Sequence, residues 1–146
     1  RRTCGEVMTK DPVFCLPGDT VNHVAQLMTT EDVGSIPVVE NFQTRKLVGI
    51  VTDRDLAIQI VAEGRDPKGI TVEEVMTKEP AACHAEDDLA QALEAMATYQ
   101  VRRIPVVDAN DQIIGIIAQA DIATRIEAPE KTAEVVEEIS KNVESE

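Results

Sequence analysis

The sequence predicts an α+β fold, α/β-like in its order of elements, in which two similar β-α-β-β-α repeats pack as a pseudo-two-fold pair. First, residues 7–39 align without a gap with residues 75–107, and 14 of these 33 positions are identical. Second, apolar residues at helical spacing precede two short β-branched runs in each copy. Third, a chain of 146 residues, 43% of them hydrophobic, suits one domain or two small packed halves.

The internal repeat keeps a constant offset over most of its length. The offset is 68 residues up to Val107 and then falls to 66. Two residues are therefore missing from the second copy near the position of residues 41–45, where a surface turn tolerates a deletion. The matched stretches are Val7–Lys10 with Val75–Lys78, Ile36–Val39 with Ile104–Val107, Gly49 with Gly115, and Asp55 with Asp121.

Both repeats have the same predicted elements in the same order. A short extended segment follows Pro12 or Pro80, and a helix then begins at a good N-cap residue. Two strands and a second helix complete the repeat, and Gly64 is placed as the C′ glycine of that helix in the first copy. The expected helices begin near Asp19 or Thr20, Asp53, Asp87 or Asp88, and Ala120, and the expected strands are 36–39, 47–51, 104–107 and 113–117. The predicted apolar helix faces are Val21, Val24, Ala25 and Met28, and Leu89, Ala92, Leu93 and Met96.

The repeats and their flanks divide the chain into four segments. A unit of roughly 55 residues buries too little surface to be stable alone, so the two repeats are expected to share a core. In the acidic stretch behind them, Val136, Ile139 and Val143 recur at helical spacing, which predicts a tail helix docked on the module or on a second copy. The predicted boundaries are 5–64 for repeat 1, 65–74 for a connector, 75–127 for repeat 2 and 128–146 for the acidic C-terminal tail.

Composition excludes several classes of function. The formal net charge of −13 repels phosphate backbones and anionic lipids, so we expect neither nucleic-acid nor membrane binding. Aromatic residues make up only 2% of the chain, too few for a base-stacking platform. We find no apolar run long enough for a membrane span and no signal peptide, and the three cysteines are an odd, widely spaced set. These features predict a cytoplasmic protein without a disulfide framework.

The duplicated order resembles the cystathionine-β-synthase (CBS) domain, and two copies in tandem resemble a CBS pair, or Bateman module. The residues that carry the resemblance are Ile36–Val39 with its copy Ile104–Val107, and Gly49–Asp55 entering the last helix. The resemblance covers about residues 5–126. The chain is similar to CBS pairs that stand alone in bacteria and archaea. The resemblance implies adenosine-containing ligands (AMP, ADP, ATP or S-adenosylmethionine) in two clefts between the repeats, no required cofactor, and a homodimer of four CBS units.

The fingerprint Gly49–Asp55 also has a chemistry of its own. The Thr52 hydroxyl can hydrogen-bond a phosphate or a ribose, and the Asp55 carboxylate can accept from two ribose hydroxyls. Backbone N–H groups at the start of the following helix favour an anion. The alternative is purely structural, with Thr52 as N-cap and Asp55 at N3 of a capping box.

The resemblance implies that each cleft joins the fingerprint of one repeat to the first two strands of the other. Arg102 and Arg103 stand out in so acidic a chain, and their planar donors suit phosphate oxygens. The alternative is a surface pair that balances nearby carboxylates. The expected residues of the main cleft, called the main set, are Thr52, Asp53, Asp55, Ala82, Cys83, Val101, Arg102, Arg103, Ile104 and Pro105.

The second cleft departs from the family pattern. Ala118 stands where the family has threonine or serine, so a hydroxyl donor is missing there. Phe14 could stack on a base in this cleft or fill the hole that an absent ligand leaves. The expected residues, called the second set, are Asp121, Phe14, Cys15, Ser35, Ile36 and Pro37.

We therefore predict a non-catalytic regulatory module that senses an adenosine-containing ligand. The alternative is a ligand-free interaction protein that acts on a protein partner through its dimer surface or its acidic tail. An enzyme is disfavoured because Asp53–Asp55 has no nucleophile or histidine partner beside it. A metal site is also disfavoured, because Cys83 and His84 are adjacent ligands without spaced partners. Cys15 and Cys83 are expected to be small core or cleft-lining residues.

Overall fold

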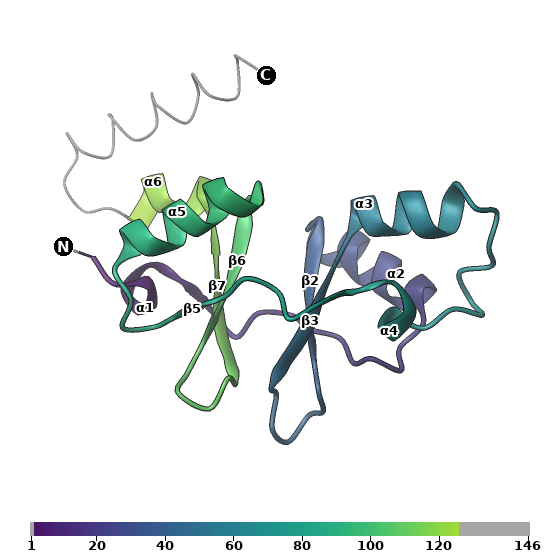
Figure 1. Cartoon of the computed structure of the whole chain (residues 1–146), viewed down its shortest axis with the longest axis horizontal. Coiled ribbons are helices and arrows are strands. Elements are labelled where there is room, and N and C mark those ends of the chain that lie inside the picture. The colour runs from purple at the N-terminus through teal and green to yellow at the C-terminus, as the bar shows by residue number, and fades with distance from the viewer. Residues whose placement is uncertain (1, 126–146) are drawn as a thin grey trace, which may run out of the picture. The chain divides into compact units, whose positions relative to one another are not determined.

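The computed structural model describes residues 2–125, which form two compact units (Figure 1). Unit 1 contains the described residues up to Lys10, Ala81–Val106 and the described residues from Ile114 on. Unit 2 contains Asp11–Pro80 and Val107–Ile113. Each unit is thus mainly one repeat joined by the leading segment of the other. The predicted tail helix at 128–146 lies outside the described residues.

Unit 1 is an α+β unit with a four-stranded sheet. Its strands run in the order β1-β7-β6-β5, and β1 and β7 pair antiparallel, with Thr9 opposite Ile116. Helices α5 and α6 lie beside β6 and β7 (Figure 1). The elements of unit 1 are α1 (Cys4–Val7), β1 (Thr9–Lys10), β5 (Cys83–His84), α5 (Leu89–Tyr99), β6 (Arg103–Val107), β7 (Ile113–Ala118) and α6 (Gln119–Arg125).

Unit 2 repeats this plan with a three-stranded sheet in the order β2-β3-β4. Cys15 adds a parallel bridge to Val38 at the place where unit 1 has β5. A π-helical turn, η1, continues α3, and Gly64 follows it with a φ of +65°, as expected for a C′ glycine. The elements of unit 2 are α2 (Val21–Glu31), β2 (Ser35–Val39), β3 (Leu47–Thr52), α3 (Asp53–Leu56), η1 (Ala57–Val61), α4 (Val72–Val75) and β4 (Thr77–Lys78).

The leading segment of each repeat packs on the sheet of the other repeat. In unit 1 the backbone N–H of Cys4 donates to the Asp87 carbonyl at 2.8 Å. In unit 2 the matching bond runs from the N–H of Val72 to the Asp19 carbonyl, also at 2.8 Å. Helices α1 and α4 were not among the predicted elements. The spacing Thr-x-x-Glu at Thr3 and at Thr71 is the local signal that would have indicated them.

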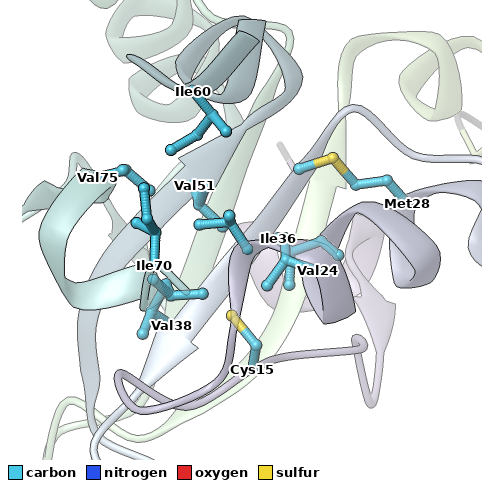
Figure 2. Packing of buried hydrophobic residues seen from close by; sticks show 11 residues of the cluster. Cys15, Val24, Met28, Ile36, Val38, Val51, Ile60, Ile70 and Val75 are labelled. Atoms are coloured by element: carbon cyan, nitrogen blue, oxygen red, sulfur yellow. The ribbon is translucent and has the colours of Figure 1, made fainter. Parts of the chain in front are cut away.

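Each unit has its own apolar core. Figure 2 shows the core of unit 2, where Val24 of α2, Ile36 of β2 and Val51 of β3 are fully buried beside Ile60 of η1. Each methylene group buried in such a core stabilises the folded unit by about 0.8 kcal/mol. The core of unit 1 consists of Cys4, Val7, Cys83, Leu89, Ala92, Met96, Ile104, Val106, Ile117 and Ile122.

The predicted helices and strands are confirmed in their type and order. Each of the four main strands is one residue longer than predicted, and the additional residues are Ser35, Thr52, Arg103 and Ala118. Two residues assigned to buried helix faces are exposed, Ala25 on α2 and Leu93 on α5. Both lie at the edge of a narrow buried face. On α2 this face is formed by Val21 and Val24, and on α5 by Leu89 and Ala92.

Candidate functional site

Thr52 and Asp55 meet where β3 ends and α3 begins. Thr52 Oγ1 accepts a hydrogen bond from the backbone N–H of Asp55 at 3.1 Å. In return, Asp55 Oδ2 accepts from the backbone N–H of Thr52 at 2.9 Å. The capping box that the spacing allowed is therefore present. It holds a hydroxyl and a carboxylate side by side, both only half-buried.

Ser35 lies directly opposite Thr52 in the ladder between β2 and β3. Beside this pair, the backbone N–H of Asp53 donates to the Gly34 carbonyl at 2.9 Å. Ser35 Oγ is buried and has no hydrogen-bond partner among the described residues. The strand register thus brings Ser35 of the second set next to Thr52 and Asp53 of the main set.

The matching place in unit 1 has the same backbone geometry and different side chains. The backbone N–H of Gln119 donates to the Arg102 carbonyl at 2.9 Å, as Asp53 does to Gly34. Arg103 is the first residue of β6, and Ala118 is the buried last residue of β7. Within unit 1 the arginine pair therefore lies beside the second fingerprint, in which Ala118 offers no hydroxyl to cap α6.

The predicted site residues are distributed over both units. Of the main set, the fingerprint residues belong to unit 2 and the rest to unit 1, and of the second set only Asp121 belongs to unit 1. Residues 101–105 run from the exposed Val101 to the buried Pro105. The members in unit 1 are Ala82, Cys83, Val101, Arg102, Arg103, Ile104, Pro105 and Asp121, and those in unit 2 are Phe14, Cys15, Ser35, Ile36, Pro37, Thr52, Asp53 and Asp55.

Phe14 has an aromatic partner within unit 2. Its ring packs against Phe42 with the ring centroids 5.9 Å apart and the planes inclined by 57°. The next residue, Cys15, is held on β2 because its N–H donates to the Pro37 carbonyl at 3.0 Å and its carbonyl accepts from Val39 at 2.9 Å. The Phe42 ring is two-thirds exposed, so this aromatic pair lies at the surface.

The cysteines are core residues rather than reactive groups. All three are free and buried, as expected for Cys15 and Cys83. Burial raises the pKa of the Cys15 thiol to about 12, and burial together with a hydrogen bond to Cys4 raises the pKa of Cys83. These thiols are protonated at neutral pH and lack the thiolate character of a nucleophile.

Residues 2–125 contain neither a candidate metal cluster nor a candidate membrane span. Within them, no cluster of three or more His, Cys, Asp or Glu side chains is arranged to hold a metal ion. None of the helices described there combines the length and the hydropathy needed to span a bilayer.

Comparison with known families gives the class of protein. The family model of the CBS domain matches residues 4–62 and again residues 72–128. The chain therefore belongs to the CBS domain family and contains two copies of the domain, with the α+β fold of a CBS pair.

Two curated relatives show the contexts in which this pair occurs. The chain is 36% identical over 135 residues to the CBS domain-containing protein YhcV of Bacillus subtilis, covering 92% of this chain and 93% of that protein. It is also 36% identical over 125 residues to the inosine-5′-monophosphate dehydrogenase of Methanocaldococcus jannaschii, covering 86% of this chain but 24% of the enzyme. The matched segment thus makes up nearly all of one relative and about a quarter of the other, which is an enzyme.

Two solved structures are similar over most of the chain. Hypoxic Response Protein I, crystallised with two coordinated zinc ions, matches with a TM-score of 0.76 and 31% identity over 85% of this chain and 98% of that one. CBSX2, crystallised in complex with AMP, matches with a TM-score of 0.73 and 26% identity over 85% and 95% of the two chains. An adenosine ligand is therefore bound by a structural relative.

Proposed function

We propose that this chain is a non-catalytic regulatory module that binds an adenosine-containing ligand through the main set. The observation that carries the proposal is the reciprocal pair Thr52–Asp55, which holds a hydroxyl and a carboxylate together at the end of β3. Membership of the CBS family and the AMP complex of CBSX2 support the adenosine part of the proposal.

The capping box leaves ligand-binding capacity in both side chains. Thr52 Oγ1 is the acceptor in its bond with Asp55, so the hydroxyl proton can be donated to a ribose or phosphate oxygen. Asp55 uses Oδ2 for the backbone N–H of Thr52, and its carboxylate has further lone pairs for ribose hydroxyls. The same contacts that cap the helix therefore fix both groups in position for a ligand.

The arginines supply the charge that a phosphate requires. Arg102 is exposed and Arg103 is half-buried on β6. An arginine fork binds phosphate oxygens with two parallel hydrogen bonds, which a single lysine cannot do. We propose that Arg102 and Arg103 bind the phosphate of a nucleotide ligand, and that the bound state biases the module toward one assembly or partner.

The first experiment is a thermal-shift panel with AMP, ADP, ATP, NADH and S-adenosylmethionine, with and without Mg²⁺. A ligand that binds the folded chain raises Tm with its concentration. The expected result is a rise with at least one ligand and loss of that rise in Asp55→Ala. A flat panel with every ligand overturns the proposal.

Glu74→Ala is the matched control for Asp55→Ala. Glu74 Oε2 accepts from the backbone N–H of Thr71 at 3.0 Å, the same N-cap contact that Asp55 makes with Thr52. Both variants lose one helix cap, so both lower the Tm of the unliganded protein. Only Asp55→Ala is expected to lose the ligand response, and equal loss in Glu74→Ala would assign the effect to stability.

A second candidate is an interaction protein that acts through its surface. Four large apolar side chains are exposed on helices of the described chain, namely Ile58, Val61, Leu93 and Tyr99. They favour association with a second copy or with another protein. Sedimentation of the wild type and of Val61→Ser, whose side chain is 76% exposed, tests a homodimer. The buried free thiols support a cytoplasmic location for either candidate.

A further inference from the structure

Two buried thiols lie against each other in unit 1. Cys4 of α1 and Cys83 of β5 belong to the same apolar core, and their thiols are hydrogen-bonded to each other. The two elements lie side by side (Figure 1), and behind Cys4 the backbone N–H of Gly5 donates to the Ala85 carbonyl at 2.8 Å. The fold thus brings together two cysteines that are far apart in the sequence.

The matching position in unit 2 has a valine in place of the first thiol. At the offset of 68 residues, Cys15 corresponds to Cys83 and Val72 corresponds to Cys4. Val72 and Cys15 are both buried in the core of unit 2, and the backbone N–H of Val72 makes a 2.8 Å bond like that of Cys4. A valine therefore satisfies the packing at this place, so packing alone does not account for the thiol of Cys4.

We propose that Cys4 and Cys83 are a redox-modification site, at which a reversible disulfide fastens the leading segment to the sheet of unit 1. The oxidant is a low-molecular-weight disulfide. Disulfides in reducing compartments are usually transient, and a thiol pair that is free in the folded chain suits such a reversible role. The proposal goes beyond the proposed function and does not depend on it.

The reaction consists of two successive thiol–disulfide exchanges. One protein thiolate attacks a sulfur of the small disulfide, so that a mixed disulfide forms and one small thiolate leaves. The second protein thiolate then attacks the cysteine sulfur of the mixed disulfide, which forms the bond between Cys4 and Cys83 and releases the second small thiolate. The two protons lost by the cysteines end on the two small thiolates. The protein thus loses two electrons, and the small disulfide gains them.

This exchange requires α1 to open. In the closed unit both thiols are buried, and burial is the main cause that raises the pKa of each, so neither is a thiolate. Helix α1 has only four residues, and a short segment with few contacts opens more easily than the rest of a fold. Opening exposes the thiols to the oxidant, and the two sulfurs then approach to the disulfide bond length of about 2.0 Å.

The fastened segment borders the second fingerprint. Behind α1, Thr9 of β1 pairs with Ile116 of β7. Met8 lies against Gly115, the glycine that opens the second fingerprint, residues 115–121. Oxidation is therefore expected to reduce the opening of the segment that packs on this fingerprint.

The test incubates the reduced full chain with glutathione disulfide and alkylates the remaining thiols in denaturant. The reduced chain offers three thiols to the alkylating reagent, and the oxidised chain is expected to offer one, that of Cys15. Trypsin then releases peptides 3–10 and 79–102, which should stay joined until a reductant separates them. The oxidised chain should also have a higher Tm, and its Gly5 amide should exchange more slowly with solvent.

Cys4→Val is the matched variant, because unit 2 has valine at the equivalent position. This variant should fold, keep both of its remaining thiols and show no rise in Tm with the oxidant. Cys15→Ala is the control, and it should oxidise as the wild type does.

Three results would overturn the proposal. In the first, all three thiols stay free after oxidation. In the second, the oxidant produces only a mixed disulfide, or a bond that involves Cys15 or joins two chains. In the third, the bond between Cys4 and Cys83 forms but changes neither Tm nor the exchange of the Gly5 amide, so that no segment is fastened. None of these measurements involves an adenosine ligand, so their failure leaves the proposed function standing.

Discussion

Met8 lies against Gly115, so closely that a Cβ on Gly115 would come within 2.8 Å of Met8 Cγ. The same relation occurs in unit 2, where Met76 Sδ would lie 2.6 Å from a Cβ on Gly49. The glycine that opens each fingerprint therefore has a packing role. It makes room for the methionine of the leading segment contributed by the other repeat.

Gly115→Ala is expected to destabilise unit 1 because the new methyl group displaces Met8. Overpacking of a core typically costs about 1–3 kcal/mol of unfolding free energy. Denaturant unfolding measures this cost, and Met8→Ala combined with Gly115→Ala should recover part of it. If the double variant were as unstable as the sum of the two single variants, the contact would not be the cause.

Val7 and Val75 occupy matching positions in α1 and α4, and the exchange of leading segments places them in different cores. Val7→Ala is expected to destabilise unit 1, and Val75→Ala unit 2, each by about 2 kcal/mol from the two methyl groups removed. Amide hydrogen exchange at Ile117 and at Val51 reports the two units separately.

The two valine variants act as controls for each other. Faster exchange at Ile117 is expected only in Val7→Ala, and faster exchange at Val51 only in Val75→Ala. The opposite pattern would show that each leading segment stays with its own repeat.

Thr52→Ala is expected to lower the unfolding free energy by about 1 kcal/mol, because α3 loses the acceptor for the Asp55 amide. Thr52→Ser keeps the hydroxyl and should stay close to the wild type. Thermal unfolding without ligand measures both. A Thr52→Ser variant as unstable as Thr52→Ala would assign the effect to the lost methyl group and not to the cap.

The buried thiol of Cys15 is expected to make the folded chain less stable at alkaline pH. Its pKa is about 12 in the folded chain against the usual 9.0, so above pH 9 the unfolded chain releases a proton that the folded chain keeps. The stabilisation is complete below pH 9 and is lost as pH rises toward 12, by about 1.4 kcal/mol per pH unit. Across this pH range, the unfolding free energy of the wild type should fall more steeply with pH than that of Cys15→Ala, by the equivalent of one released proton. Identical slopes would contradict the buried, protonated thiol.

The elements that the sequence predicted correctly are those with local signals. Val21, Val24 and Met28 recur at helical spacing behind the N-cap Thr20, and all three are buried. The spacing of Thr52 and Asp55 allowed a capping box as the structural alternative to a ligand-binding role, and the box is present. Such patterns depend on a few neighbouring residues, so they can be recognised without the rest of the fold.

The features that escaped prediction depend on residues far apart in the chain. Pairing of Thr9 with Ile116 joins the first residues to the last strand, and no periodicity in either segment indicates it. The π-helical turn η1 was likewise missed, because its residues fit an ordinary helix. The place of Ser35 next to Thr52 follows from the antiparallel register of β2 and β3, which no local pattern in either strand indicates by itself.

By itself, the sequence determined the duplication, the order of the elements and the residue types of the fingerprint, because repetition, periodicity and capping are local properties. Only the tertiary structure decided which leading segment completes which sheet, and which polar side chains lie together. Sheet pairing and register join residues across the whole chain, so Ser35 lies beside Thr52 in unit 2 and Arg102 beside Gln119 in unit 1.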